Sequence, residues 1–187
     1  RAIAILRPFL TDYSEAELSQ CVGAAYNQLK FDTPAVAPVV RVDENRHVLE
    51  LWHGPTSAFK DMALQLLPQL LSLALTKTQE SAEIVILVAT SGDTGKAALE
   101  GFKDVPRIKI VVFFPDNGVS EMQKLQMVTQ EGNNVAVIRV RGNFDDAQTG
   151  VKQIFADKSI NAVLQRQGFK LSSANSINWG RLVPQIV

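Results

Sequence analysis

The sequence predicts an α/β protein whose core is a parallel sheet. From about residue 82 to residue 173, short apolar segments alternate with segments of helical periodicity. One of them, Ile84–Ala89, is a continuous apolar run with β-branched residues, which is typical of a strand buried on both faces. Strict alternation of strands and helices favours parallel strands joined by right-handed crossovers. The predicted strands are Ile84–Ala89, Ile108–Phe114, Val135–Val140 and Phe169–Ser172, and the predicted helices are Thr94–Phe102, Ser120–Gln130, Phe144–Phe155 and, beyond this region, Ile177–Val187.

The first fifty residues combine helical, loop and strand patterns. Ser14–Leu29 is predicted as a helix, because Ser14 is a good N-cap and the apolar residues that follow recur every four positions. Asp32–Pro38 contains two prolines and is predicted as a loop. Val48–Trp52 is predicted as a short strand.

A long apolar helix is expected after the turn His53–Ser57. Pro and Gly end the preceding strand, and Thr56 or Ser57 is expected to cap the helix. The helix runs to about Leu75 and is apolar on most faces, so it is expected to be buried, with a kink at Pro68.

The amino-acid composition argues against several classes of function. Nineteen basic residues balance nineteen acidic ones, which gives no electrostatic reason to expect a nucleic-acid or membrane partner. The single cysteine, Cys21, excludes a disulfide framework. His47 and His53 have no partner at metal-ligand spacing, so no metal site is predicted. The longest apolar stretch, Met62–Leu75, is too short to span a bilayer, which needs about 20 apolar residues.

Lys60 is the first candidate for chemistry. It lies just inside the expected buried helix, between Phe59 and Asp61. Apolar surroundings penalise the ammonium form and lower the pKa of a lysine, and a helix N-terminus also disfavours positive charge. Both effects favour the free amine, which is the form that makes a Schiff base. An ordinary lysine that pairs with Asp61 or reaches solvent is the alternative.

The second candidate is the segment Thr90–Gly95, with the sequence Thr-Ser-Gly-Asp-Thr-Gly, which follows a buried strand and opens a helix. Backbone N–H groups at a helix N-terminus, together with small hydroxyl residues, make an anion site. Ligands also favour the carboxyl ends of strands in such sheets. The spacing fits neither the dinucleotide-binding fingerprint nor the Walker A pattern. A capped turn without a ligand is the alternative.

The third candidate is the segment Ser172–Arg181, which also lies after a strand and at the start of a helix. Arg181 is expected in the first helical turn, where its charge opposes the helix dipole. A bound phosphate or carboxylate would relieve this conflict and match the guanidinium fork. A polar loop with an exposed arginine is the alternative. A further polar segment, Gly142–Asp146, is interpreted as a helix cap with acidic residues in the first turn.

Together these segments resemble the threonine synthase family. His53–Asp61 is similar to the family's cofactor-lysine motif, Thr90–Gly95 to its substrate loop, and Asn175–Asn178 followed by Arg181 to its third signature. The motifs occur in the family's order, and the resemblance extends over essentially the whole chain. It implies the second fold type of pyridoxal-5′-phosphate (PLP) enzymes, with two α/β domains and the cofactor between them. It also implies conversion of O-phospho-L-homoserine and water to L-threonine and phosphate.

The same resemblance implies roles for individual residues. Lys60 would carry PLP and then shuttle protons, and Asp93 would face the pyridine ring of the cofactor. The implied substrate-binding residues are Ser91, Gly92, Thr94, Asn175 and Arg181. A small-molecule substrate, a cytoplasmic location and a place in threonine biosynthesis are expected from the same resemblance.

The resemblance also divides the chain. Residues 82–173 would form a small α/β domain, residues 1–81 the first part of a large domain that includes Lys60, and residues 174–187 the return into that large domain. The family's glycine-rich loop for the cofactor phosphate has no match here. We therefore expect a truncated chain that binds PLP poorly and is inactive alone. Apolar surfaces without partners, above all on Met62–Leu75, are expected to be loosely held or to cause self-association.

Two other interpretations stay open. Another PLP enzyme of the same fold, such as a hydroxyamino-acid dehydratase or a sulfhydrylase, would also need Lys60, but its substrates carry no phosphate and give Arg181 no role. A non-catalytic domain that binds a phosphorylated ligand or a partner chain would have no need of Lys60.

Overall fold

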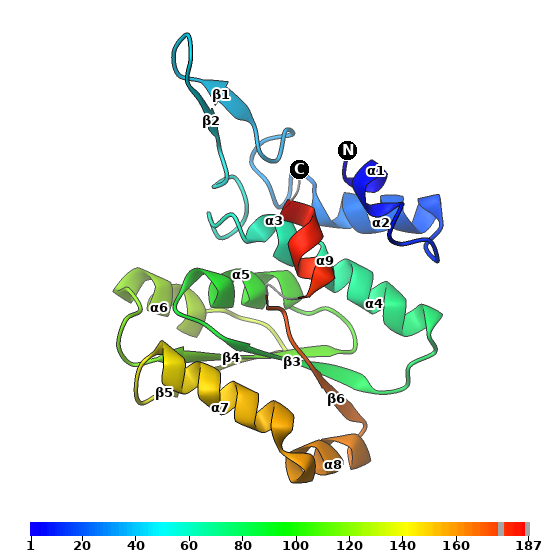
Figure 1. Cartoon of the computed structure of the whole chain (residues 1–187), viewed down its shortest axis with the longest axis vertical. Helices are drawn as coiled ribbons and strands as arrows, with labels where there is room; N and C mark the ends of the chain where they lie inside the picture. Colours follow the sequence, from blue (N-terminus) through cyan, green and yellow to red (C-terminus); the bar gives the residue numbers. More distant parts are fainter. Residues whose placement is uncertain (176–177, 186–187) are drawn as a thin grey trace.

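The computed structural model describes residues 1–175 and 178–185, and it confirms the predicted α/β fold with a parallel sheet (Figure 1). The sheet has the strand order β5-β4-β3-β6, and each neighbouring pair is parallel. The strands are β3 (Glu83–Ala89), β4 (Ile108–Pro115), β5 (Val135–Val140) and β6 (Phe169–Ser172). These bounds agree almost residue for residue with the predicted strands.

Helices cover both faces of this sheet (Figure 1). On one face lie α5 (Asp93–Phe102) and α6 (Glu121–Val128), and on the other lie α7 (Phe144–Ala156) and α8 (Lys158–Arg166). The first three agree with the predicted helices, but α8 was missed. Its start signal is present, because the Asp157 side chain accepts hydrogen bonds from the N–H groups of Ser159 and Ile160. None of its residues is buried, so it adds little to the core.

Two helices lie near the start of the chain. α1 (Ala2–Leu6) was not predicted. α2 (Glu15–Ala25) begins where it was predicted, and Ser14 and Glu17 form reciprocal capping hydrogen bonds there. α2 ends earlier than predicted, because the Asn27 side-chain amide donates to carbonyl groups of its last turn.

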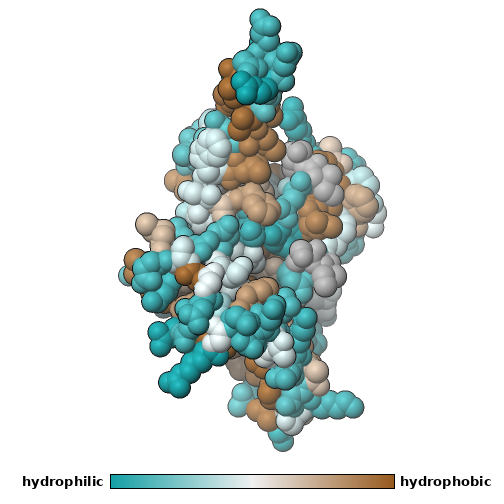
Figure 2. Space-filling view, turned by 60° about the vertical axis from the view of Figure 1, so that its left-hand side comes forward, coloured by the Kyte–Doolittle hydropathy of each residue, from teal (hydrophilic) through white to brown (hydrophobic). Residues whose placement is uncertain are grey.

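A β-hairpin projects from the rest of the molecule (Figures 1 and 2). β1 (Val39–Arg41) pairs with β2 (His47–Leu49) in an antiparallel ladder. The predicted strand Val48–Trp52 overlaps β2 only at its start, and β1 was not predicted. All residues of both strands are exposed, so the alternation of buried and exposed positions on which strand prediction depends is missing.

The segment that was predicted as one buried helix forms two. α3 (Asp61–Leu64) and α4 (Leu67–Lys77) are separated by a turn, and Pro68 lies at the start of α4, where its missing N–H is tolerated. The prediction of burial is confirmed for Met62, Ala63, Leu64, Leu66, Leu67, Leu70 and Leu75. The expectation that this apolar surface lacks partners within the chain is therefore wrong.

The partners of α3 and α4 form two hydrophobic cores. Leu64 and Leu67 belong to the core of the sheet, whereas Leu66 and Leu70 pack in a second core with α1 and α2. α3 and α4 thus join the N-terminal helices to the sheet. The proposed division into domains at residues 81 and 82 stays a prediction.

After β6 the chain returns to the neighbourhood of α3 (Figure 1). α9 (Trp179–Leu182) is followed by a 3₁₀ turn, η1 (Val183–Gln185), so the predicted helix Ile177–Val187 does not continue as one α-helix. Its first residue and its last two residues lie outside the described part of the chain. Among the described helices, none has the length and apolar character needed to cross a membrane.

Gly101 marks the close approach of α5 to α3, because a Cβ atom built on it would lie 1.9 Å from the carbonyl oxygen of Leu64. We expect Gly101→Ala to lower the free energy of unfolding by about 1–3 kcal/mol, which is the usual cost of overpacking. Gly23→Ala, in α2, is a matched control, since nothing lies within 4 Å of a Cβ at that position. It should raise the same free energy by about 0.5–1 kcal/mol through helix propensity. Urea unfolding measures both, and an unchanged stability for Gly101→Ala would contradict the close approach.

Candidate active site

A cavity of about 560 Å³ opens beside the carboxyl end of β3, and α7, α9 and the start of α3 contribute to its walls. Four of the predicted site residues line it: Lys60, Thr94, Asn175 and Arg181. Lining residues that were not predicted include Phe59, Phe144, Gln148, Lys152 and Gln185. The cavity therefore brings together segments that are far apart in the sequence, at the edge of the sheet where ligands of parallel-sheet proteins bind. A second cavity, of about 410 Å³, lies against α7 and contains none of the predicted site residues.

Lys60 lies immediately before α3, as its N-cap residue, rather than inside the helix as predicted. Its side chain is 18% exposed, and its Nζ lies 3.9 Å from Oδ2 of Asp93. Nζ also lies 4.1 Å from the centre of the Phe59 ring, within range of a cation–π contact. Burial lowers the pKa of Lys60 and the charge of Arg181 lowers it further, whereas the carboxylate of Asp93 raises it. The net effect lowers the pKa of Lys60, which is the direction that the sequence predicted.

The neighbouring Asp61 fixes the turn that carries Lys60. Its side chain is fully buried, and its two oxygens accept hydrogen bonds from the backbone N–H and the hydroxyl of Thr56, at 2.8 and 2.7 Å. Thr56 therefore donates to Asp61, and the prediction that Thr56 or Ser57 caps the helix is wrong. Gly54 makes room for this pair, because a Cβ at that position would lie 2.6 Å from Cβ of Asp61.

The loop Thr90–Gly95 joins β3 to α5 and is closed by the buried hydroxyl of Thr90. That hydroxyl accepts hydrogen bonds from the N–H groups of Gly92 and Gly95, at 3.0 and 2.9 Å. Thr94 lies in the first turn of α5 and lines the cavity. Ser91 and Gly92 are not among the described lining residues. The structure thus places only part of the predicted loop against the cavity.

Asp93 is the first residue of α5 and lies beside the cavity, in contact with Lys60. Its other carboxylate oxygen, Oδ1, accepts a hydrogen bond of 2.7 Å from the side-chain amide of Gln123 on α6. Its side chain is about half exposed, at 51%. The sequence singled out Asp93 but not Gln123, although Ser120-x-x-Gln123 is a recognisable capping box.

Arg181 lies in the single turn of α9, as predicted, and it is buried, at 4%, so the alternative of an exposed arginine is wrong. Its Nη1 donates to the side chain of Gln185. Its Nε is buried and has no hydrogen-bond partner among the described residues. Burial lowers the pKa of Arg181. An arginine with an unsatisfied N–H at the wall of a cavity is suited to bind an anion there.

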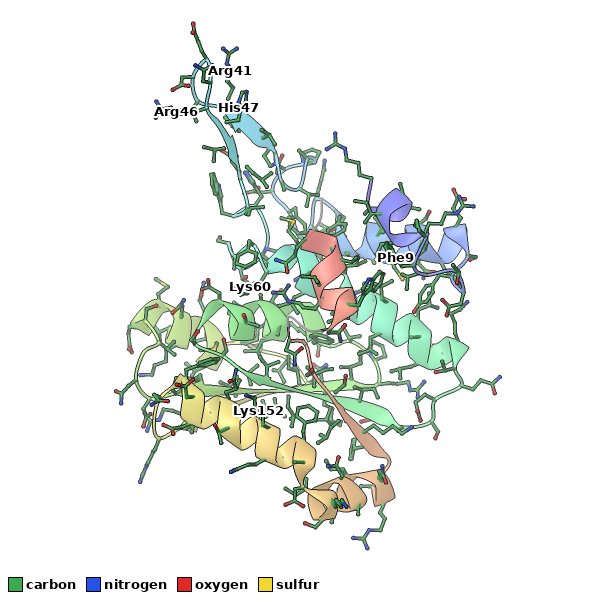
Figure 3. All side chains as sticks on the ribbon, in the orientation of Figure 1. Phe9, Arg41, Arg46, His47, Lys60 and Lys152 are labelled. Atoms are coloured by element: carbon green, nitrogen blue, oxygen red, sulfur yellow. The ribbon has the colours of Figure 1, made fainter. Side chains whose placement is uncertain are left out.

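α7 contributes residues that sequence reasoning missed. Asn143 caps this helix, which confirms the interpretation of Gly142–Asp146 as a helix start. Phe144, Gln148 and Lys152 follow at intervals of four and all line the cavity. Nζ of Lys152 lies 3.2 Å from Oε1 of Gln148. The spacing was visible in the sequence, but nothing there indicated that this face lines the same cavity as Lys60. Figure 3 shows Lys152 on α7 and Lys60 before α3.

His53 is held by carboxylates on both sides. Its Nδ1 lies 2.5 Å from Asp32 and its Nε2 lies 2.8 Å from Glu50, and the hydrogen bonds to these two groups raise its pKa. Within the described residues, no group of three His, Cys, Asp or Glu side chains gathers in an arrangement that would hold a metal ion.

No family model matches the chain. It is, however, 44% identical over its full 187 residues to threonine synthase from Pseudomonas aeruginosa, and it spans 38% of that protein. It is also 44% identical to threonine synthase-like 1 from Homo sapiens over 182 residues. This aligned region covers 94% of this chain and 24% of that protein. PLP-bound threonine synthase from Brucella melitensis has a similar structure, with a TM-score of 0.86 and 41% identity over 98% of this chain and 38% of that chain.

This chain is homologous to threonine synthases. The resemblance drawn from the three motifs is thereby confirmed, and so is the fold, which matches part of a threonine synthase. The chain spans less than half of the length of each of these relatives. The roles of the individual site residues stay predictions.

The buried carboxyl of Asp61 predicts a pH dependence of stability. Burial raises its pKa, against the opposing effect of the hydrogen bonds from Thr56. The folded chain therefore binds this proton more tightly than the unfolded chain does, and the stability that the protonated group contributes is lost as pH rises through the raised pKa. We expect the native chain to lose stability relative to Asp61→Asn over that range. Urea unfolding at a series of pH values checks this, and parallel curves for the two proteins would show that the pKa of Asp61 is not raised.

Proposed function

We propose that this chain carries the cofactor lysine of a PLP-dependent threonine synthase, and that the whole protein converts O-phospho-L-homoserine and water to L-threonine and phosphate. The observation that carries the proposal is the meeting of Lys60 and Arg181, two largely buried cations, at one cavity. The homology to threonine synthases supports it.

Positive charge predominates at this cavity. Lys60, Lys152 and Arg181 line it, and Asp93 is the carboxylate that the described residues place beside Lys60. A buried charge without a partner is costly, so an anion that pairs with it is bound favourably. O-Phospho-L-homoserine carries a carboxylate and a phosphate, and its charges therefore complement those of the cavity.

The residues at the start of α3 fit PLP. Lys60 lines the cavity, and burial lowers the pKa of its amine. A lower pKa raises the share of the neutral amine, which is the form that attacks an aldehyde. PLP, when bound, acts as an electron sink for the bonds of an attached amino acid. Lys60 would hold the cofactor through this amine, and the same amine would take and return protons of the bound substrate. Asp93, 3.9 Å away, stabilises the amine in its protonated form.

Arg181 is the residue that we propose binds the substrate phosphate. Its Nε–H has no acceptor among the described residues, and the guanidinium fork matches a phosphate in two-bond geometry. Thr94, in the first turn of α5, and Asn175 line the same cavity and would bind the substrate's remaining polar groups. The proposed part of Ser91 and Gly92 in substrate binding is supported by their motif alone.

A turnover experiment tests the proposal. The whole protein, saturated with PLP, is supplied with O-phospho-L-homoserine, with serine or with threonine. Formation of threonine and phosphate from the first substrate supports the proposed function. Turnover of serine or threonine without any reaction of the phosphorylated substrate would favour another PLP enzyme of the same fold.

Lys60 should be the residue that PLP labels. Borohydride reduction in the presence of PLP, followed by peptide mapping, should place the label on Lys60, because its amine is buried at the cavity and has a lowered pKa. Lys152 lines the same cavity and is the competing amine, so Lys152→Ala is the matched control and should keep the label. Lys60→Ala should remove the label and abolish turnover without unfolding the chain. A label on Lys152 or another lysine would overturn the assignment.

Arg181 should decide affinity for the phosphorylated substrate. A charge-assisted hydrogen bond contributes about 1.5–3 kcal/mol, so Arg181→Ala should lower kcat/KM by about 10- to 150-fold. Arg181→Lys keeps the charge but loses the fork and should also be impaired. Arg166→Ala, on the exposed face of α8, is the control and should leave the kinetics unchanged. Unchanged kinetics in Arg181→Ala would refute the proposed role.

A further inference from the structure

A chain of polar contacts runs from α6 to the amine of Lys60. Nε2 of Gln123 donates to Oδ1 of Asp93 at 2.7 Å, and Oδ2 of the same carboxylate lies 3.9 Å from Nζ of Lys60. Gln123 belongs to none of the three motifs. Its contact with Asp93 joins two helices that are separate in sequence, so it depends on how α6 packs beside α5.

Ser120 determines which way the Gln123 amide points. The backbone N–H of Ser120 donates to Oε1 of Gln123 at 3.2 Å, and the Ser120 hydroxyl lies 3.1 Å from the same oxygen. A backbone N–H is only a donor, so the amide oxygen must face Ser120 and the NH₂ group must face Asp93. The capping box of α6 thereby presents a hydrogen-bond donor to the carboxylate.

Gly92 leaves the space that the Gln123 amide occupies. Its φ of +147° lies in a region that favours glycine, and a Cβ built on it would lie 2.5 Å from Cδ and Nε2 of Gln123. The amide therefore packs directly on the backbone of the loop that carries Asp93. The backbone of the loop and the side chain from α6 are complementary in shape at this point.

We propose that Gln123 is a positioning residue, which binds one oxygen of Asp93 and so holds the other against the amine of Lys60. The Asp93 side chain is about half exposed, so without this bond it is free to turn toward solvent. Lys60 would then lose the carboxylate beside it. The proposal deepens the proposed function, because it concerns the amine to which PLP would attach, but its contacts do not depend on the identity of the substrate.

Asp93 raises the pKa of Lys60, and the other charged groups near Lys60 do not. Arg181, on α9, lowers the pKa of Lys60, as burial does, and Lys152, on α7, brings a further positive charge to the same cavity. Asp61, the next residue in the chain, directs its carboxylate to Thr56. Asp93 is the group that raises the pKa of Lys60. Loss of its contact should therefore lower that pKa.

A titration of Lys60 tests the proposal without cofactor or substrate. Lysine amines are reductively methylated with ¹³C-formaldehyde, the Lys60 signal is assigned by its loss in Lys60→Arg, and its pH midpoint is followed by NMR. We compare Gln123→Met, which keeps the length of the side chain but removes the amide, with Asp93→Asn and with the double variant. Gln126→Met makes the same chemical change on the same helix and is the matched control.

We expect Gln123→Met to shift the Lys60 midpoint to lower pH, in the direction of Asp93→Asn, and to add nothing when Asp93 is already Asn. Gln126→Met should leave the midpoint unchanged. A midpoint that moves in Asp93→Asn but not in Gln123→Met would show that Asp93 needs no help from α6 and would overturn the proposal. Equal shifts in Gln123→Met and Gln126→Met, or no shift in any variant, would overturn it as well. Because the readout requires no turnover, its failure would leave the proposed function standing.

Discussion

The arrangement of the cavity depends on one buried carboxylate. Asp61 has no exposed surface, and its two oxygens accept both hydrogen-bond donors of Thr56. A buried polar group without partners is costly, so this pair holds the turn from Gly54 to Lys60 in one conformation. The motif around Lys60 therefore has two functions: Gly54, Thr56 and Asp61 determine where the chain turns, and Lys60 supplies the amine. A change in the first group should misplace the amine even though the amine itself is unaltered.

The packing of α5 against α3 brings the turn that carries Lys60 close to the rest of the site. Gly101 allows α5 to approach α3 at the carbonyl group of Leu64, and α5 carries Asp93 at its start. Thr90 closes the loop before α5 by accepting two backbone N–H groups. The close approach of two helices and the closed loop thus place Asp93 beside Lys60, because the attraction between a lysine and a half-exposed carboxylate is too weak to do so alone. The same apolar packing that stabilises the sheet positions the polar groups at its edge.

The sequence predicted the sheet of this fold most closely. β3 was located because a continuous apolar run is typical of a buried parallel strand, and β4 to β6 because short apolar segments alternate with helical ones. The hairpin β1–β2 was largely missed because all of its residues are exposed. α3 and α4 were predicted as one helix, because a segment that is buried on nearly every side has no amphipathic period to show where a helix stops. Among the site residues, Lys60, Thr94, Asn175 and Arg181 were found from their motifs, whereas Lys152 and Gln123 reach the site through tertiary packing, which no local pattern reveals.

The pKa of Lys60 also depends on tertiary packing that the sequence does not reveal. Sequence reasoning assigned the lowered pKa to burial and to the positive end of a long helix. Burial is the first cause in the structure, but α3 has only one turn, and the aligned peptide dipoles of so short a helix sum to little. The remaining influences come from Asp93 on α5 and Arg181 on α9, which act in opposite directions. The protonation of the amine is therefore set by where α5 and α9 pack, so a substitution that moves either helix should alter the chemistry of Lys60 without touching its own turn.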